Sequence, residues 1–378
     1  MNLYLKIIII FVFLASSFGC NKKTSFENLN TINIGASSIT NLSEIIEEIE
    51  YVLIEKPNVP INQIDKFFIL NDGYLIADTY GNSVVLKFDM LGNFINQIGN
   101  YGEGPEEYLQ IADVDLFNDY VIFLSADKLL TYSIDGKYLH SEMLDFRPYR
   151  FLHSDSSHYL FFIPESMAIE LKNKQNDGVL FSYNKGSKES ENLIKSIFPK
   201  TFNFMGEKNN LFKNDKEILF STSFCDTIYA IENGNIAEKY ALNFGKSQIN
   251  LSTLYGLDIH QMVSKINSSA FDESAIHIPH LFQNKNFLIT AFRKNKKFDF
   301  LIYDKKTDRP YLTSKLKNDL DQGPDIGIIK GIDDDYLYAF REPEEFDENQ
   351  FSKLISADLA NPDRKEVFWV LSKYKLKK

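Results

Sequence analysis

Cysteine is nearly absent from this chain, since only Cys20 and Cys225 occur among its 378 residues. Two cysteines cannot build the disulfide framework that holds many small secreted domains together. Cys225 follows Phe224 in a strand-like stretch, and no base or redox partner lies nearby in the sequence. We therefore expect Cys225 to be a packed, unreactive thiol.

An excess of basic residues is also lacking. The chain has 41 Lys and Arg against 52 Asp and Glu, which gives a formal net charge of −11 at pH 7. Nucleic-acid binding depends on neutralising phosphates with clustered Lys and Arg side chains. The composition therefore predicts a protein without a nucleic-acid partner.

Familiar catalytic motifs are missing as well. The sequence contains neither a G-x-S-x-G nucleophile elbow nor an H-E-x-x-H zinc pair. His277 and His280 are three residues apart, but Pro279 breaks a helix, and no nearby cluster completes a set of metal ligands. Acidic residues are scattered, so spacing identifies no acid/base pair. We expect no metal, no cofactor and no catalytic residue.

The N-terminal apolar run is short. Lys6 precedes apolar residues 7–14, and small residues follow. This run is shorter than the roughly 20 residues of a transmembrane helix. A positive residue, a short apolar stretch and small residues are typical of a signal peptide, which we assign to residues 1–19.

The signal peptide ends at a cysteine. Gly19-Cys20 resembles the end of a bacterial lipobox, in which the cysteine is lipidated and becomes the mature N-terminus. An ordinary secretory signal followed by a chance cysteine is the alternative. With residues 20–30 as lipidated cysteine and polar tether, we expect a membrane anchor through Cys20. The expected location is the bacterial cell envelope, on the periplasmic or outer-membrane side.

Aromatic residues, by contrast, are plentiful, with 32 Phe and 20 Tyr in short apolar runs between turn signals. Between residues 67 and 115 the pattern predicts a four-stranded antiparallel meander. Its first Asn/Asp turn recurs six times from Asp72 to Asp334, at a spacing of about 52 residues, and a second turn recurs later in each unit. Six such units are typical of a β-propeller.

The sequence therefore predicts an all-β fold, a single six-bladed β-propeller of four-stranded antiparallel blades over residues 31–378. Strands expected at 31–34 and 51–54 have no partners of their own, and we expect them to close the ring in the sixth blade. Residues 42–50 are compatible with a helical turn. Apolar spacing predicts one short inserted helix at 252–266, and both a lid or docking role and packing on the rim stay open.

Four stretches resemble a known family. They are Ile64-Asp65-Lys66, the F-D-x-x-G-x-F turn at 88–94, GEGPEEY at 102–108 and KNDLDQGP at 317–324. They resemble the six-bladed, NHL-like β-propeller lipoproteins of Bacteroidetes, and the GxGPxEY loop is the most specific of them. The resemblance implies a cell-envelope lipoprotein but supplies no catalytic residues.

The Gly-rich loop at 102–108 does not have the features of a phosphate site. A strand pattern follows it instead of a helix, and its three glutamates would repel phosphate. We expect a structural loop between blades. Gln322 stands where the corresponding later loop of the family usually has a second glycine.

The predicted loops divide between two faces of the propeller. Tight turns, between the first and second and the third and fourth strands, share one face, called the turn face here. Links between blades and between the second and third strands share the other, the loop face. All long segments belong to the loop face, at residues 99–110, 145–150, 164–178, 196–210, 245–280, 293–297, 318–327 and 341–350.

Loops on a rigid scaffold often carry function. Cationic and aromatic side chains on the loop face are candidate anchors for an anionic or sugar-like ligand, although they can also be solvated or paired with acidic neighbours. These candidates are Arg147, Tyr149, Arg150, Arg293 and Arg341.

Three classes of function stay open. We favour a non-enzymatic, monomeric binding or interaction scaffold that contacts an envelope protein, peptide or glycan. The second class is a hydrolase or lyase of the propeller lactonase kind, with its site at the channel mouth. The third is a sensory propeller that acts with a signalling partner. Fold alone does not decide among them.

Overall fold

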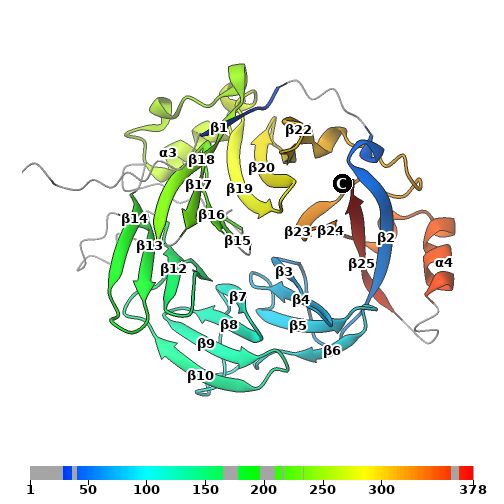
Figure 1. Cartoon of the computed structure of the whole chain (residues 1–378), viewed down its shortest axis with the longest axis horizontal. Coiled ribbons are helices and arrows are strands. Elements are labelled where there is room, and N and C mark those ends of the chain that lie inside the picture. Colours follow the sequence, from blue (N-terminus) through cyan, green and yellow to red (C-terminus); the bar gives the residue numbers. More distant parts are fainter. Residues whose placement is uncertain are drawn as a thin grey trace, which may run out of the picture.

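The computed structural model describes residues 29–35, 41–164, 178–195, 209–214, 217–232, 234–358 and 366–377. Six sheets form a ring (Figure 1), so the predicted six-bladed propeller is confirmed. Residues 1–28, with the expected signal peptide and Cys20, lie outside the described residues. Within the described ranges, no helix has the length and apolar character needed to cross a membrane.

Blades 1 to 3 follow one another along the chain as antiparallel meanders. Blade 1 contains β3 (Lys66–Ile69), β4 (Gly73–Asp78), β5 (Val84–Asp89) and β6 (Phe94–Gln97). Blade 2 contains β7 (Asp113–Phe117), β8 (Tyr120–Ser125), β9 (Lys128–Ser133) and β10 (Tyr138–Met143). Blade 3 contains β11 (Arg150–His153), β12 (His158–Phe162), β13 (Gly178–Asn184) and β14 (Ser190–Lys195).

Blades 4 to 6 complete the ring, and two of them include strands from the N-terminal part of the chain. Blade 4 contains β15 (Leu211–Lys213), β16 (Ile218–Phe220), β17 (Thr227–Glu232), β18 (Asn235–Asn243) and β1 (Asn30–Asn33). Blade 5 contains β19 (Ile276–Gln283), β20 (Phe287–Lys294), β21 (Lys297–Asp304) and β22 (Arg309–Leu312). Blade 6 contains β23 (Ile328–Ile332), β24 (Tyr336–Arg341), β25 (Val367–Leu376) and β2 (Ile46–Glu55).

An N-terminal strand closes the ring, as predicted. Strand β2 pairs antiparallel with β25, and the register runs from the Ile46–Leu376 pair to the Glu55–Val367 pair. This strand is longer than the expected 51–54, and the helical turn expected at 42–50 shrinks to a 3₁₀ turn at Leu42–Glu44.

The first strand does not join the sixth blade, which corrects the prediction. Strand β1 instead adds to blade 4, parallel to the outer strand β18. Ile32 of β1 is 1% exposed because it packs in an apolar cluster with Tyr240 and Leu242 of β18. The apolar alternation in the sequence predicts that Ile32 is buried, but not which sheet buries it.

The hydrophobic core lies between blades. The cluster between blades 1 and 2, for example, contains the fully buried side chains of Leu75, Val85, Val121 and Leu130. Both faces of each sheet therefore bury apolar residues, which explains the continuous apolar runs in the inner strands.

Side chains also bridge neighbouring blades along the inner strands, whose inner edges have no strand partner. Lys66 Nζ of blade 1 donates to the Val114 carbonyl oxygen of blade 2 at 3.0 Å. Asp113 Oδ2 of blade 2 accepts from Phe151 N of blade 3 at 3.0 Å. These bonds satisfy polar groups at the inner edges and connect one blade to the next.

The expected helix at 252–266 is shorter than predicted. A 3₁₀ turn occupies Leu251–Leu254, and the helix itself, α3, runs over Ile259–Ile266. Gly256 has a φ of +77°, a left-handed conformation that interrupts the helix, and Asp258 then caps α3.

The described residues contain a second helix, α4 (Glu348–Ala357), where a single helix was expected. It lies on the rim beside β2 (Figure 1). Asp347 and Gln350 form a capping box at its start, which is the sequence signal that could have predicted it. Gln350 Nε2 also donates to the carbonyl oxygen of Gln322 at 2.5 Å, and Gln322 has the φ of +65° that favours glycine.

Candidate functional site

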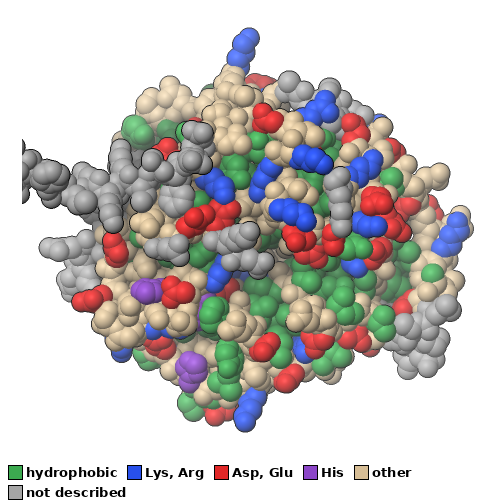
Figure 2. Space-filling view, viewed as in Figure 1, with side chains coloured by type: hydrophobic (Ala, Val, Ile, Leu, Met, Phe, Trp, Pro, Cys, Tyr) green, Lys and Arg blue, Asp and Glu red, His purple; other side chains and the backbone are tan. Residues whose placement is uncertain are grey.

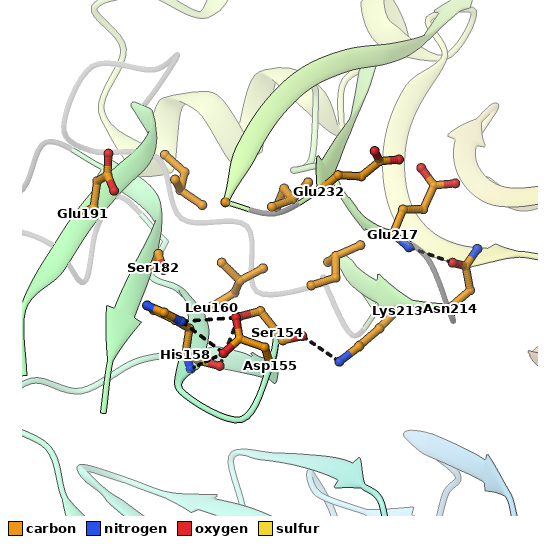
Figure 3. A pocket seen from close by; sticks show the side chains of 14 residues that line it. Ser154, Asp155, His158, Leu160, Ser182, Glu191, Lys213, Asn214, Glu217 and Glu232 are labelled. Carbon is orange, nitrogen blue, oxygen red and sulfur yellow. Dashed lines mark hydrogen bonds and ion pairs between the residues drawn. The ribbon is translucent and has the colours of Figure 1, made fainter. Parts of the chain in front are cut away.

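A cavity of about 580 Å³ lies between blades 3 and 4 on the turn face (Figure 3). The β11–β12 and β15–β16 turns both contribute to its wall. Strands β15 and β16 have only three residues each, so blade 4 covers less of its neighbour there. Aliphatic, basic, acidic and uncharged polar side chains all line the cavity.

Aliphatic side chains from both blades form the apolar part of the lining. They are Leu160 and Leu193 from blade 3 and Ile218 and Ile231 from blade 4. All four belong to the apolar cluster between these blades or pack against it. The cavity is therefore continuous with the interblade core, whose side chains hold its shape.

A histidine stands at the β11–β12 turn with both ring nitrogens engaged. His158 Nδ1 lies 3.1 Å from Asp155 Oδ1, and Nε2 lies 3.0 Å from Asn184 Nδ2. Asp155 also accepts from the backbone N–H groups of Ser157 and His158. Although burial opposes the effect, these donors lower the pKa of Asp155. The carboxylate and the amide together fix the orientation of the imidazole.

Two charged groups of the lining are compensated within the fold. Lys213 Nζ donates to the carbonyl oxygens of His153 and Ser154 at 2.9 and 2.8 Å. The Glu217 side chain, 10% exposed, forms an ion pair with Lys239. The Lys213 bonds join blade 4 to blade 3, the Glu217–Lys239 pair lies within blade 4, and neither charge is fully available to a ligand.

Two other carboxylates of the lining are available. Glu191 of β14 is exposed and Glu232 of β17 is half-buried, and they stand on opposite sides of the cavity (Figure 3). Within the described part of the chain, neither has a hydrogen-bond or ion-pair partner. The cavity therefore offers an apolar surface with an uncompensated carboxylate on each wall.

The predicted ligand-binding residues lie at the loop-face ends of their strands and links, away from this cavity. Tyr149 and Arg150 lie together where β11 begins, and Arg147 is exposed in the preceding link. Arg293 Nη2 donates to Asn267 Oδ1 at 3.1 Å, and Arg341 forms an ion pair with Glu345. The structure brings only Tyr149 and Arg150 into contact, so ligand binding by this set stays a prediction.

Arg150 has a role in the fold. Its side chain is buried, Nη1 donates to the Ala112 carbonyl oxygen of blade 2 at 2.5 Å, and Nη2 donates to Tyr80 Oη at 3.0 Å. The guanidinium carbon lies 4.2 Å from the centre of the Tyr149 ring. Arg150 thus connects blades 2 and 3 in the same way as Lys66 connects blades 1 and 2.

The two histidines of the H-I-P-H stretch are buried in β19. His277 contacts the Cys225 carbonyl oxygen through Nδ1 and Thr290 Oγ1 through Nε2, at 2.5 and 2.7 Å. His280 Nε2 lies 2.9 Å from the Ile329 carbonyl oxygen. Among the residues that the structure describes, no group of three or more His, Cys, Asp and Glu could hold a metal ion.

The remaining motifs are structural. In the Gly-rich loop, Tyr132 Oη donates to the Glu106 carbonyl oxygen at 2.8 Å, and Glu107 accepts from Gly104 N at 2.9 Å, so the loop folds against blade 2 as expected. Cys225 is buried, and burial raises the pKa of its thiol. This environment fits the predicted packed, unreactive thiol.

The interblade cavity was not predicted. Its lining comes from turns and strands of two blades that are separate in the sequence, so no local motif marks it.

On the face seen in Figure 2, acidic and basic side chains of the described residues are interspersed, and no continuous basic patch is visible.

Comparison with known proteins identifies a family that matches this chain. A family model described as "Domain of unknown function (DUF4934)" matches residues 29–372. No curated protein matches the chain. Among solved structures, a Bacteroides fragilis protein described as exported is similar, with 20% identity and a TM-score of 0.74, over 93% of this chain and 100% of that one. At this identity the likeness supports the fold alone.

Two other structures are more distant. BamB from Moraxella catarrhalis has 15% identity and a TM-score of 0.40, over 69% of this chain and 67% of its own. The extracellular domain of a hybrid two-component system from B. thetaiotaomicron has 10% identity and a TM-score of 0.40, over 73% of this chain and 31% of its own. The match over residues 29–372 shows that the chain belongs to the family described as DUF4934.

Proposed function

We propose that this protein is a binding protein of the bacterial cell envelope, and that its ligand occupies the cavity between blades 3 and 4. One observation carries the proposal, a cavity of about 580 Å³ that combines four aliphatic side chains with nine polar or charged ones. Small-molecule sites commonly have volumes of about 300–1,000 Å³, and this cavity falls within that range. The ring of blades holds both walls in place without a ligand.

The engagement of the imidazole and the amine in the cavity favours binding over catalysis by these two groups. A general base needs a free lone pair within reach of the proton that it removes. The imidazole that lines the cavity has Asp155 at one nitrogen and Asn184 at the other, and Lys213 is engaged with two carbonyl oxygens. A mechanism that used this imidazole or this amine would first have to break these bonds, whereas the carboxylates of Glu191 and Glu232 keep their lone pairs.

The location rests on the N-terminal sequence. A short apolar run followed by Gly19-Cys20 supports export and a lipid anchor, as in the NHL-like lipoproteins that the chain resembles. A larger envelope partner, whether protein, peptide or glycan, would contact the loop face at Arg147 and its neighbours. In this arrangement the loop face serves the partner and the turn face serves the ligand.

A cavity-filling variant tests the proposal. Ser182 lies in β13, half-buried, opposite Leu160 and Glu191 of the adjacent strands, and it lines the cavity. In a thermal-shift panel of 1,5-diaminopentane, spermidine, succinate, N-acetylglucosamine and Ala-Ala, we expect at least one compound to stabilise the wild type. Ser182→Trp should remove that response because the indole occupies the ligand's volume.

The matched control is Ser141→Trp, at an exposed position of β10. This variant should respond to the compound as the wild type does. A panel without any response would overturn the proposal, as would a compound that stabilises Ser182→Trp as much as the wild type.

A further inference from the structure

We infer that the cavity between blades 3 and 4 binds a linear aliphatic diamine or polyamine, an inference that rests on the proposed function and names its ligand class. The first argument is the pair of carboxylates. Glu191 and Glu232 stand on opposite walls, one from each blade (Figure 3). A carboxylate attracts an ammonium group through charge-assisted hydrogen bonds. Two separated carboxylates therefore favour a ligand with an ammonium group towards each end.

The second argument is the aliphatic part of the lining. Leu160, Leu193, Ile218 and Ile231 line the same cavity and belong to, or pack against, the interblade core. Methylene groups gain free energy when such a surface removes them from water. A ligand with charged ends and an apolar middle matches this distribution better than a sugar, which has hydroxyl groups along its whole length.

The third argument is the charge balance of the remaining lining. Lys213 is a basic side chain of the lining that would attract an anionic ligand. Its Nζ, however, already donates to two backbone carbonyl oxygens. Glu217 is paired with Lys239, and Asp155 contacts the imidazole of His158. Among the lining residues that the structure describes, an anionic ligand would meet two uncompensated carboxylates and a lysine that already donates to two carbonyl oxygens, which disfavours it.

A single lysine side chain of a peptide is the closest competing ligand. It carries one ammonium group and would satisfy one of the two carboxylates. A free diamine satisfies both and needs no peptide backbone at the turn face. The number of charges on the ligand is therefore the property that the experiment should vary.

Isothermal titration of the full-length protein tests this inference with matched compounds. We expect 1,5-diaminopentane and spermidine to bind. 1-Aminopentane, with one charge, should bind at least about tenfold more weakly, since one charge-assisted contact is worth about that factor. 1,5-Pentanediol should give no measurable heat. Equal affinity for the diol and the diamine would overturn the inference, as would tighter binding of Nα-acetyl-lysine methylamide than of either amine.

Matched variants assign the binding to the two carboxylates. The double variant Glu191→Gln/Glu232→Gln should weaken diamine binding at least about tenfold, whereas Glu344→Gln, at an exposed loop-face position, should leave it unchanged. Equal effects in the double variant and the control would contradict the assignment. If another compound of the panel binds and Ser182→Trp blocks it while diamines fail, the ligand class is wrong and the proposed function stands.

Discussion

Single polar side chains connect neighbouring blades to one another. Asp113, Lys66, Arg150 and Lys213 each reach a backbone group of the adjacent blade. Inner strands have no partner at the axis, so these side chains satisfy groups that would otherwise be buried without a hydrogen bond. Charged residues on the inner strands therefore stabilise the fold as well as contributing to any binding surface.

Replacing Arg150 should therefore destabilise the protein. Arg150→Ala removes the guanidinium donor from the Ala112 carbonyl oxygen and from Tyr80 Oη, which keeps its contact with Tyr149 Oη, and should lower the free energy of unfolding by about 2–4 kcal/mol. Urea denaturation measures this change. The control Arg147→Ala, at an exposed position, should change it by no more than about 0.5 kcal/mol. An unchanged midpoint for Arg150→Ala would show that this bond does not support the fold.

The buried side chain of His153 predicts that the free energy of unfolding decreases at acid pH. Burial, together with nearby Lys185 and Lys213, lowers the pKa of His153 from 6.5 to about 3. The unfolded chain then binds a proton that the folded chain does not, so stability present above pH 6.5 is lost as the pH falls towards 3. His153→Phe keeps the stacking on Phe117 and removes this titration. Its free energy of unfolding should fall less steeply below pH 6.5 than that of the wild type.

The measurement is urea denaturation at a series of pH values from 7 down to about 4. His140→Phe, at an exposed position of β10, is the control and should follow the wild type. Parallel curves for His153→Phe and the wild type would mean that His153 does not contribute to the acid sensitivity.

At the scale of elements, two N-terminal strands have unequal roles. Strand β2 has ten residues and completes blade 6, whereas β1 has four and adds a fifth strand to blade 4. A chain that begins at residue 41 lacks β1 only, and we expect it to unfold cooperatively at a somewhat lower temperature. A chain that begins at residue 57 also lacks β2, so the edge of β25 is exposed and the ring stays open.

Differential scanning calorimetry and size-exclusion chromatography distinguish these outcomes. The shorter chain should lose its cooperative transition and elute as aggregate, because an unpaired strand edge recruits other chains. A cooperative, monomeric propeller from residue 57 onward would contradict a closing role for β2.

At the scale of the whole molecule, the closed ring joins six units whose contacts are mostly with their neighbours. Its turn face holds the cavity between blades 3 and 4, and its loop face holds the long links and both described helices. The two faces can thus contact different molecules at once. A tether at the N-terminus would keep the ring near a membrane without using either face.

Replacing Cys20, the expected lipidation site, tests that arrangement in cells. Cys20→Ala should shift the protein from the membrane fraction to the soluble fraction and remove the mass of the acyl chains from its N-terminus, because the apolar run alone does not anchor it. Cell fractionation with mass spectrometry provides the measurement. Cys225→Ala, which removes the other cysteine, should leave the distribution unchanged. A Cys20→Ala protein that stays in the membrane fraction would contradict lipid anchoring.

The sequence by itself determined the six blades, the closing strand and the division into two faces. Each of these depends on local signals, namely the turns near Asp72 and its five counterparts and the apolar runs between them. Turn chemistry and strand alternation act over a few residues, so they can be recognised without the structure. Gly256 near the start of the expected helix at 252–266 is a local signal of a weak first turn, but the residue at which α3 begins does not follow from it.

Only the tertiary structure decided where β1 pairs, that Arg150 is engaged within the fold, and that a cavity separates blades 3 and 4. Each depends on residues that are distant in the sequence, such as Ile32 with Leu242, and Glu191 with Glu232. A periodic sequence presents similar apolar faces and similar charges in every blade. Which of them meet, and which stay free for a ligand, follows from how the blades pack around the ring.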